Sequence, residues 1–143
     1  MSPDRHATRS LPSVSVGEEL PPLEIPLSRT LIISTAIASR DYQDVHHDPD
    51  LAKMRGSPDI FMNILSTNGF VGRYVTDWAG PEAILRKVEI RLGAPNYPGD
   101  TMTLEGCVTA RDDEARTIEV SVRGRNGLGD HVVGRVVLAL PEA

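Results

Sequence analysis

The sequence has little of several features that mark particular classes of protein. Its 143 residues include one cysteine, Cys107, which excludes an internal disulfide and leaves no companion thiol for a metal site. No stretch approaches the roughly 20 apolar residues of a membrane-spanning helix. Lys and Arg number 15 against 20 Asp and Glu. Because no basic cluster is interleaved with aromatic residues, a nucleic-acid partner is disfavoured.

The composition of the N-terminal segment bears on export and on local order. Its first residues, MSPDRHATRS, are polar and predict no secretory leader, so we expect a soluble protein of the reducing cytoplasm. Five of the 11 prolines (Pro3, Pro12, Pro21, Pro22, Pro26) lie near this end. We predict a flexible tail over residues 1–13 and one domain over residues 14–143, which is long enough to bury its own core.

The first half of the domain has helical periodicity after one short strand within residues 14–29. A short helix is expected over residues 31–40, with Thr30 as its N-cap, followed by a loop over residues 41–50. Asp48 and Pro49 predict the start of a second short helix that ends near Met54. A longer helix over about residues 60–78 is apolar around most of its circumference, which is typical of a buried helix.

The second half changes to an alternation of apolar and polar residues with period two. Four such runs, separated by turn sequences, predict an antiparallel meander over residues 87–92, 101–108, 118–123 and 132–140. The economical packing is an α+β hot-dog fold, in which a curved sheet wraps one long helix. The edges of a single sheet favour pairing with another chain, so we expect an oligomer.

The densest polar cluster lies between the first two helices, and three interpretations of it stay open. Its members are Asp41, Asp44, His46, His47, Asp48 and Asp50. A metal site is disfavoured because the adjacent histidines point apart in extended chain and no partner motif is present. Asp41 and His46 can instead converge on one water as a general acid/base pair. The third interpretation is a solvated loop in which Asp48 only caps the next helix.

The cluster resembles the hydratase motif of the MaoC-like, (R)-specific enoyl-CoA hydratases. The segment is SRDYQDVHHDPDLA (residues 39–52), and the family pattern has glycine, asparagine and proline where this chain has Arg40, Gln43 and Asp44. Three further segments, DIFMNIL, RYVTDWAGP and RNGLGDHV, resemble the small subunits of actinobacterial two-chain hydratases of steroid side-chain degradation. The similarity covers about residues 14–140.

This resemblance implies a function and a set of site residues. Asp41 and His46 would add water across the C2=C3 bond of a bulky trans-2-enoyl-CoA, with CoA as part of the substrate and no separate cofactor. The backbone N–H of Ile60, at the start of the long helix, would bind the thioester oxygen. Further expected contacts are Ser57, Asp59, Asn63 and Asn68 for the acyl group, and Lys87, Arg91 and Arg123 for CoA phosphates.

The resemblance also implies a partner. The chain would be the catalytic half of a heterotetramer with a larger MaoC-like subunit that lacks the Asp/His pair. Three alternatives stay open: a homodimeric (R)-specific hydratase of ordinary fatty enoyl-CoA, a hot-dog thioesterase, and a non-catalytic acyl-binding subunit.

Overall fold

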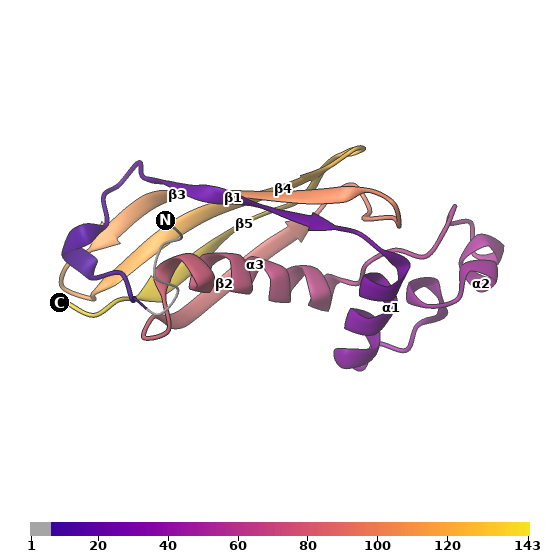
Figure 1. The fold of residues 1–143 in the computed structure, drawn as a ribbon, viewed down its shortest axis with the longest axis horizontal. Helices are drawn as coiled ribbons and strands as arrows, with labels where there is room; N and C mark the ends of the chain where they lie inside the picture. Colours follow the sequence, from indigo (N-terminus) through magenta and orange to yellow (C-terminus); the bar gives the residue numbers. More distant parts are fainter. Residues whose placement is uncertain (1–6) are drawn as a thin grey trace.

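One antiparallel sheet and one long helix make up the body of the molecule (Figure 1). A computed structural model describes residues 7–143, and within that range the chain forms five strands and three α-helices. The strands are β1 (Glu19–Pro26), β2 (Ile84–Leu92), β3 (Thr101–Asp112), β4 (Thr117–Asn126) and β5 (Gly129–Ala139). The helices are α1 (Arg29–Ala38), α2 (Pro49–Met54) and α3 (Ile64–Ala79).

The sheet has the strand order β1-β3-β4-β5-β2, and α3 lies along one face of it (Figure 1). This arrangement confirms the predicted α+β hot-dog fold. The meander is confirmed for β3, β4 and β5 but is wrong for β2, which pairs with β5 instead of β3. The chain after β2 stays bonded to β5, because Gly93 N–H donates to the carbonyl of His131 at 2.7 Å. Residues 94–100 then carry the chain across the sheet to β3.

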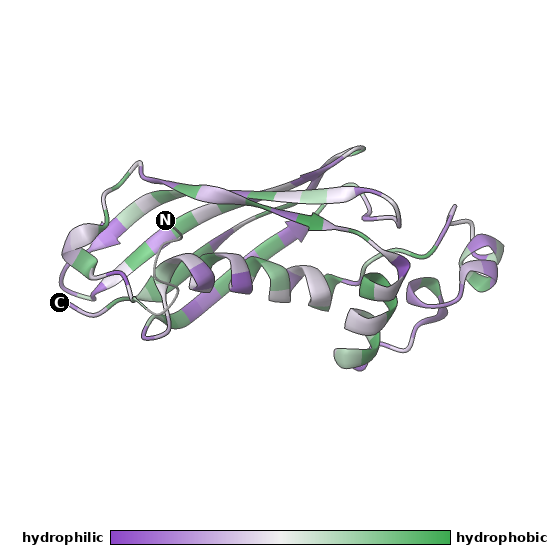
Figure 2. Cartoon of the chain, in the orientation of Figure 1, coloured by the Kyte–Doolittle hydropathy of each residue, from purple (hydrophilic) through white to green (hydrophobic). Residues whose placement is uncertain are grey.

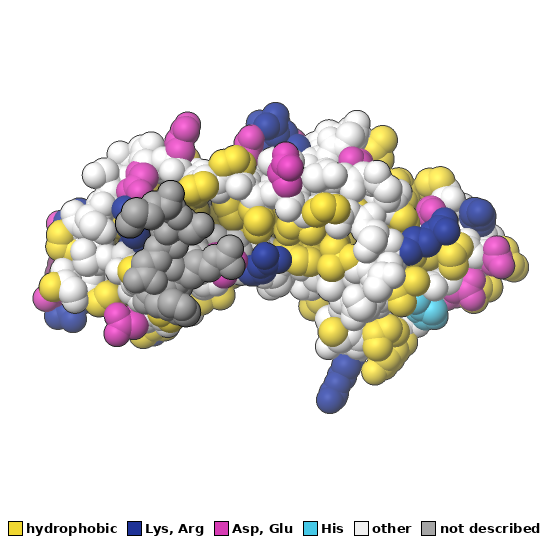
Figure 3. Space-filling model, in the orientation of Figure 1, with side chains coloured by type: hydrophobic (Ala, Val, Ile, Leu, Met, Phe, Trp, Pro, Cys, Tyr) yellow, Lys and Arg dark blue, Asp and Glu magenta, His cyan; other side chains and the backbone are white. Residues whose placement is uncertain are grey.

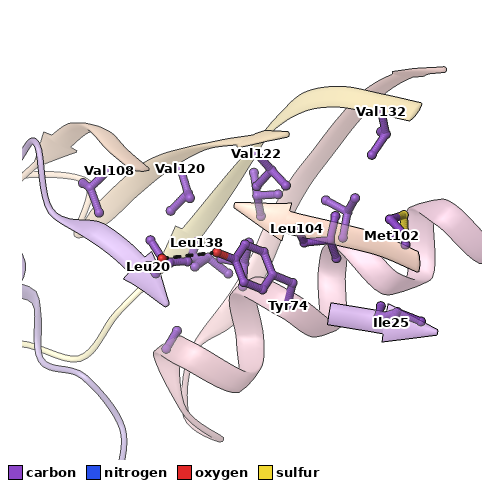
Figure 4. Close-up of a cluster of buried hydrophobic side chains, with 14 of the residues drawn as sticks. Leu20, Ile25, Tyr74, Met102, Leu104, Val108, Val120, Val122, Val132 and Leu138 are labelled. Carbon is purple, nitrogen blue, oxygen red and sulfur yellow. Dashed lines mark hydrogen bonds between the residues drawn. The ribbon is translucent and has the colours of Figure 1, made fainter. Parts of the chain in front are cut away.

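The core lies between α3 and the inner face of the sheet (Figure 4). Tyr74 of α3 is buried there, and this burial, with nearby Glu105, raises the pKa of Tyr74 to about 12. The phenol therefore stays protonated and donates to the carbonyl of Pro21 at 2.9 Å. Around it pack the buried side chains of the strands: Leu20, Ile25, Met102, Leu104, Val108, Ile118, Val120, Val122, Val132, Val136 and Leu138. Each such side chain contributes about 1.5–3 kcal/mol by leaving water.

The alternation along the strands separates this core from a charged outer face (Figure 2). On the outer face Arg135 contacts Glu89 at 2.5 Å and Glu119 at 3.2 Å, joining three strands. These groups are exposed, and exposed ion pairs contribute little to stability. The stability of the sheet therefore comes from its inner face.

The start of the described chain differs from its prediction. Arg9 N–H donates to the carbonyl of Ala79 at 2.7 Å, and Leu11 N–H donates to the carbonyl of Pro141 at 2.8 Å. Leu11 and Val14 are buried against the end of the core. The predicted flexible tail is therefore wrong for residues 7–13, because apolar burial and backbone hydrogen bonds hold them, while residues 1–6 lie outside the described range.

Two predicted helix starts are also wrong. Helix α1 begins at Arg29 with Ser28 as its N-cap, since the Ser28 hydroxyl accepts from Leu31 N–H at 3.0 Å. Helix α3 begins at Ile64 instead of residue 60. The residues just before Ile64 bond to distant segments of the same chain instead of to the helix. For example, Met62 N–H donates to the carbonyl of Asn96 at 3.1 Å. The predicted start of α2 is confirmed, with Asp48 as the N-cap.

A buried histidine ties α3 to the loop that follows β2. His131 is 1% exposed, with Nδ1 2.7 Å from the carbonyl of Ala94 and Nε2 2.8 Å from the hydroxyl of Thr67. A carbonyl only accepts, so Nδ1 carries the proton and Nε2 accepts from Thr67. Burial lowers the pKa of His131 and outweighs the opposing effect of its bond to Ala94.

Acidification should therefore destabilise the fold through His131. Because the pKa is lower in the folded state, the unfolded chain binds the proton first. This contribution to stability is present above the unfolded pKa near 6.5 and is lost as the pH falls below it. His131→Gln keeps hydrogen-bonding groups without titrating there. Urea unfolding measures the free energy of unfolding at pH 7.5 and 5.5. Between these two values it should fall more in the wild type than in His131→Gln, by up to about 1.4 kcal/mol per pH unit. Equal losses would contradict this role.

Candidate active site

Asp41 is positioned by the way α1 ends. The helix terminates in a Schellman motif, in which Arg40 N–H donates to the carbonyl of Ile37 at 3.0 Å and Asp41 N–H donates to that of Ala36 at 3.0 Å. Arg40 has a φ of 57°, the left-handed conformation that such a motif needs. Asp41 is therefore fixed as the second residue beyond the C-cap of the helix, Ser39.

His46 is held by a carbonyl from a distant part of the chain. It ends a short 3₁₀ turn, Asp44–His46, and its side chain is 8% exposed. Its Nδ1 lies 2.7 Å from the carbonyl of Phe61, and Phe61 N–H donates back to the carbonyl of Val45 at 3.1 Å. Since the carbonyl only accepts, Nδ1 carries a proton, so the neutral form of His46 presents the lone pair of Nε2.

That lone pair faces the carboxylate of Asp41. His46 Nε2 lies 3.5 Å from Asp41 Oδ2, and the Asp41 side chain is 21% exposed. With His46 neutral, both groups are acceptors, so one water can donate a hydrogen to each. The pair thus has the geometry to orient a water and remove its proton, as a general base requires.

Asn63 joins this pair to the start of α3. As the N-cap, its Oδ1 accepts from Ser66 N–H at 3.1 Å and also from the Ser66 hydroxyl. Its Nδ2 donates to Asp41 Oδ2 at 3.1 Å and to the Ser39 hydroxyl at 2.9 Å. The sequence prediction that Asp41 and His46 converge is therefore matched by the geometry, with Asn63 as a third member of the cluster.

Asp41 is ionised at neutral pH. Burial acts to raise its pKa, but three effects together outweigh this and hold the pKa below its ordinary value. These are the Asn63 hydrogen bond, the donation from Gln43 N–H to Oδ1 at 3.3 Å, and the charge of His46 when protonated. The carboxylate can thus accept a hydrogen bond from water over the whole physiological range.

The expected oxyanion group at Ile60 is not free. Ile60 lies before the helix, and its N–H donates to the carboxylate of Asp59 at 2.8 Å. The carboxylate of Asp59, an expected acyl-group contact, is instead paired with Arg29 at 2.9 Å. Ser57 donates to the carbonyl of Asp59 at 2.6 Å. The amides of the first turn of α3, at Ile64 and Leu65, donate to no acceptor among the described residues.

The other predicted contacts are not brought to the pair. Asn68 is exposed on α3. Lys87 and Arg123 are exposed on the outer face of the sheet, paired with Glu89 and Asp130 at 2.7 Å each. Arg91 is exposed on the same strand, four residues beyond Lys87. This face is opposite the one that α3 covers, so these cations do not line the Asp41–His46 site.

Within residues 7–143, no three His, Cys, Asp or Glu side chains lie together as a metal would require. In the same range no helix is long and apolar enough to cross a membrane.

Sequence reasoning missed the two backbone groups that orient the pair. The carbonyl of Phe61 fixes the proton of His46, and the amide of Gln43 supports Asp41. Every residue has these groups, so no side-chain pattern could single them out. Asn63 was selected as a polar residue on a buried helix, but its contact with Asp41 depends on the packing of α3 against α1.

The chain is similar to known proteins over most of its length. A family description, the MaoC like domain, matches residues 13–126. The 3-oxo-4,17-pregnadiene-20-carboxyl-CoA hydratase beta subunit of Mycobacterium tuberculosis is 52% identical over 128 residues, which cover 90% of this chain and 98% of that subunit.

Solved structures show the same relationship. A chain in the crystal structure of the ChsH1-ChsH2 complex from Mycobacterium tuberculosis is 53% identical, with a TM-score of 0.85, and the match covers 88% of this chain and 98% of that one. The R-hydratase PhaJ1 from Pseudomonas aeruginosa has the same TM-score at 19% identity, over 94% of this chain and 86% of that one. At that identity the likeness shows the fold alone.

The backbone at Arg40 provides a test of how Asp41 is held. A left-handed residue with a side chain costs about 1–2 kcal/mol, and glycine removes this cost but adds about 0.5–1 kcal/mol of chain entropy. Arg40→Gly should therefore raise the free energy of unfolding by up to about 1 kcal/mol, while Arg40→Val should lower it by about 1 kcal/mol or more.

The matched control is Arg116→Gly, because Arg116 has a φ of 59° in the turn between β3 and β4. Urea unfolding should show a similar small gain in the free energy of unfolding for Arg116→Gly. A loss of more than about 1 kcal/mol in Arg40→Gly would contradict the assigned backbone conformation.

Proposed function

This chain belongs to the MaoC-like domain family, and we propose that it is the catalytic subunit of an enoyl-CoA hydratase for bulky, steroid side-chain enoyl-CoA thioesters. The observation that carries the proposal is the Asp41–His46 pair, 3.5 Å apart, with two acceptor atoms facing each other beside the start of α3. The sequence similarity to the hydratase beta subunit supports the same reaction and substrate class.

The reaction follows from the proton positions at the pair. A water donates to Asp41 and to Nε2 of His46, and its oxygen forms a bond to C3 of the enoyl group as one of its protons passes to the pair. The electrons of the C2=C3 bond move towards the thioester oxygen, and C2 then takes a proton from the pair. The sum is the addition of one water, with the pair returned to its first state.

Hydrogen-bond donors must stabilise the negative charge that develops on the thioester oxygen. The first-turn amides of α3, at Ile64 and Leu65, are unpaired among the described residues, and the positive end of the helix dipole adds to their effect. They replace Ile60 as the proposed oxyanion group. Because Asn63 directly precedes them and contacts Asp41, these donors and the water-binding pair lie on the same side of the molecule.

Apolar side chains near the pair suit a bulky acyl group. Ile64 and Leu65 are each 51% exposed, and Ile37, one turn before Asp41, is 44% exposed. Hydrophobic side chains gather on the lower part of α1 and in a band between β1 and α3, whereas the α2 end also carries charged side chains (Figure 3). Contiguous exposed apolar surface marks a ligand or partner site.

Removing either acceptor of the Asp41–His46 pair should slow turnover. Asp41→Asn and His46→Ala should each lower turnover by about 10²-fold or more, because each removes one of the two acceptors for water. The assay is loss of the conjugated-thioester absorbance with a steroid side-chain enoyl-CoA and with a short-chain enoyl-CoA, in the presence and absence of the larger partner.

His47→Ala is the matched control and should stay within a few-fold of the wild type, since it alters only the neighbouring imidazole. Unchanged turnover in Asp41→Asn would overturn the assignment. Release of free CoA thiol would indicate a thioesterase, and turnover of only short chains without a partner would indicate an ordinary homodimeric hydratase.

We also propose that the larger MaoC-like partner pairs with the β2 edge of the sheet. The other edge, β1, contains Pro21, Pro22 and Pro26, which lack the N–H that strand pairing needs. Strand β2 has no proline, and its Ile84 and Leu85 are 52% and 43% exposed. An open apolar edge is the surface on which another chain adds. We further propose that this complex acts in the cytoplasm, which the CoA thioester substrate and the one free thiol, Cys107, support.

The edge assignment predicts a loss of assembly. Leu85→Glu should abolish copurification with the larger subunit, because it buries a charge without a partner at the contact. Leu128→Glu is the matched control: Leu128 is 63% exposed but lies in the turn between β4 and β5. A complex that survives Leu85→Glu and fails with Leu128→Glu would reverse the assignment.

A further inference from the structure

The side chain of Asn63 is the most constrained polar group outside the Asp41–His46 pair. It is 2% exposed, and it contacts three separate segments: the end of α1 at Ser39, the loop at Asp41, and the first turn of α3 at Ser66. An amide side chain has two donor hydrogens and an oxygen with two lone pairs. All four are used, so Asn63 has no capacity left for a substrate hydrogen bond.

The orientation of this amide is determined by its partners. Ser66 N–H is a donor and requires the oxygen of Asn63 on its side. The carboxylate of Asp41 is an acceptor and requires the nitrogen. Reversing the amide would set two donors together at the buried Ser66 N–H and two acceptors together at the half-buried Asp41, and polar groups left without a partner in such places destabilise the structure.

We infer that Asn63 is a positioning residue for the proposed hydration, which holds the Asp41 carboxylate in the orientation that faces His46. The inference rests on the proposed function. Asn63 donates to Oδ2, the same oxygen that lies 3.5 Å from His46 Nε2. Without that donor, the Asp41 side chain loses the contact that fixes this oxygen opposite His46.

The same contact keeps Asp41 charged. Burial acts to raise the pKa of Asp41, and the largest effect in the opposite direction is the hydrogen bond from Asn63. The ionisable side chain that faces Asp41 is His46, from the 3₁₀ turn, while Asn63 of α3 and Ser39 of α1 are neutral. Loss of the Asn63 donor therefore moves the acid limb of the pH–rate profile to higher pH.

Two substitutions at position 63 separate this role from helix capping. Asn63→Asp keeps an oxygen for Ser66 N–H, and aspartate caps as well as asparagine, but it sets a second carboxylate against Asp41. Asn63→Ser also keeps a capping hydroxyl, on a side chain too short to reach Asp41. Ser28→Ala is the control, because it removes the N-cap of α1 without touching Asp41.

The experiment measures kcat, KM and the pH dependence of kcat in the complex with the larger subunit, together with urea unfolding. We expect kcat to fall about 10- to 100-fold in Asn63→Asp and Asn63→Ser, as for loss of one hydrogen bond to a charged group, with KM within about 3-fold. In Asn63→Asp the acid limb of the pH–rate profile should move to higher pH by about one pH unit or more. Ser28→Ala should lower only the stability.

The outcomes distinguish the two proposals. If the wild type has no hydratase activity, or Asp41→Asn retains it, the proposed function fails. If Asp41→Asn is inactive but folded Asn63→Ser keeps the wild-type kcat and pH profile, the function stands and the role of Asn63 is overturned. A kcat loss in Ser28→Ala equal to that of Asn63→Ser also overturns it, since capping alone would then explain the effect.

Discussion

The packing of α3 against the inner face of the sheet determines where everything else lies. Val71, Tyr74 and Val75 are buried in that contact, so the C-terminal two-thirds of the helix cannot shift without opening the core. The N-terminal turn is thereby brought to one end of the sheet, beside α1. The polar cluster forms there because the core leaves no freedom for the residues just before Ile64.

Backbone groups, more than side chains, orient the two reactive residues. The end of α1 sets the direction of Asp41, and the carbonyl of Phe61 sets the proton of His46. Both anchors belong to rigid parts of the chain and are themselves hydrogen bonded. A pair held in this way is preorganised, which reduces the rearrangement needed when a substrate arrives.

The three departures from the MaoC-like motif are each accommodated in the structure. Arg40 adopts the left-handed backbone that glycine adopts freely. Gln43 contributes its backbone N–H, so its side-chain identity does not matter for the contact with Asp41. Asp44, which stands in place of a rigid proline, is held by Arg55 at 2.8 Å. Each of the three positions therefore has a defined role in the loop of this chain.

The sequence by itself determined most of the elements and the candidate residues of the site. Period-two and helical patterns identify β2 to β5 and α3, while the polar cluster left three interpretations open, of which the family resemblance favours the Asp41–His46 pair. These features depend on neighbours in the chain, and local patterns report them directly. The strand order and the docking of residues 7–13 depend on contacts between distant segments, as does the start of α3.

The fine structure of the site was decided only in three dimensions. Ile60 was predicted to supply an oxyanion donor because the apolar pattern starts the helix there and the family resemblance implies a donor at the helix start. Instead, Ile60 bonds to the neighbouring Asp59, and Phe61 and Met62 bond to Val45 and Asn96, outside the helix. Asn63 contacts Asp41 across 22 positions of sequence. Composition fixes which groups are present, whereas the tertiary packing of α3 against α1 fixes which of them meet.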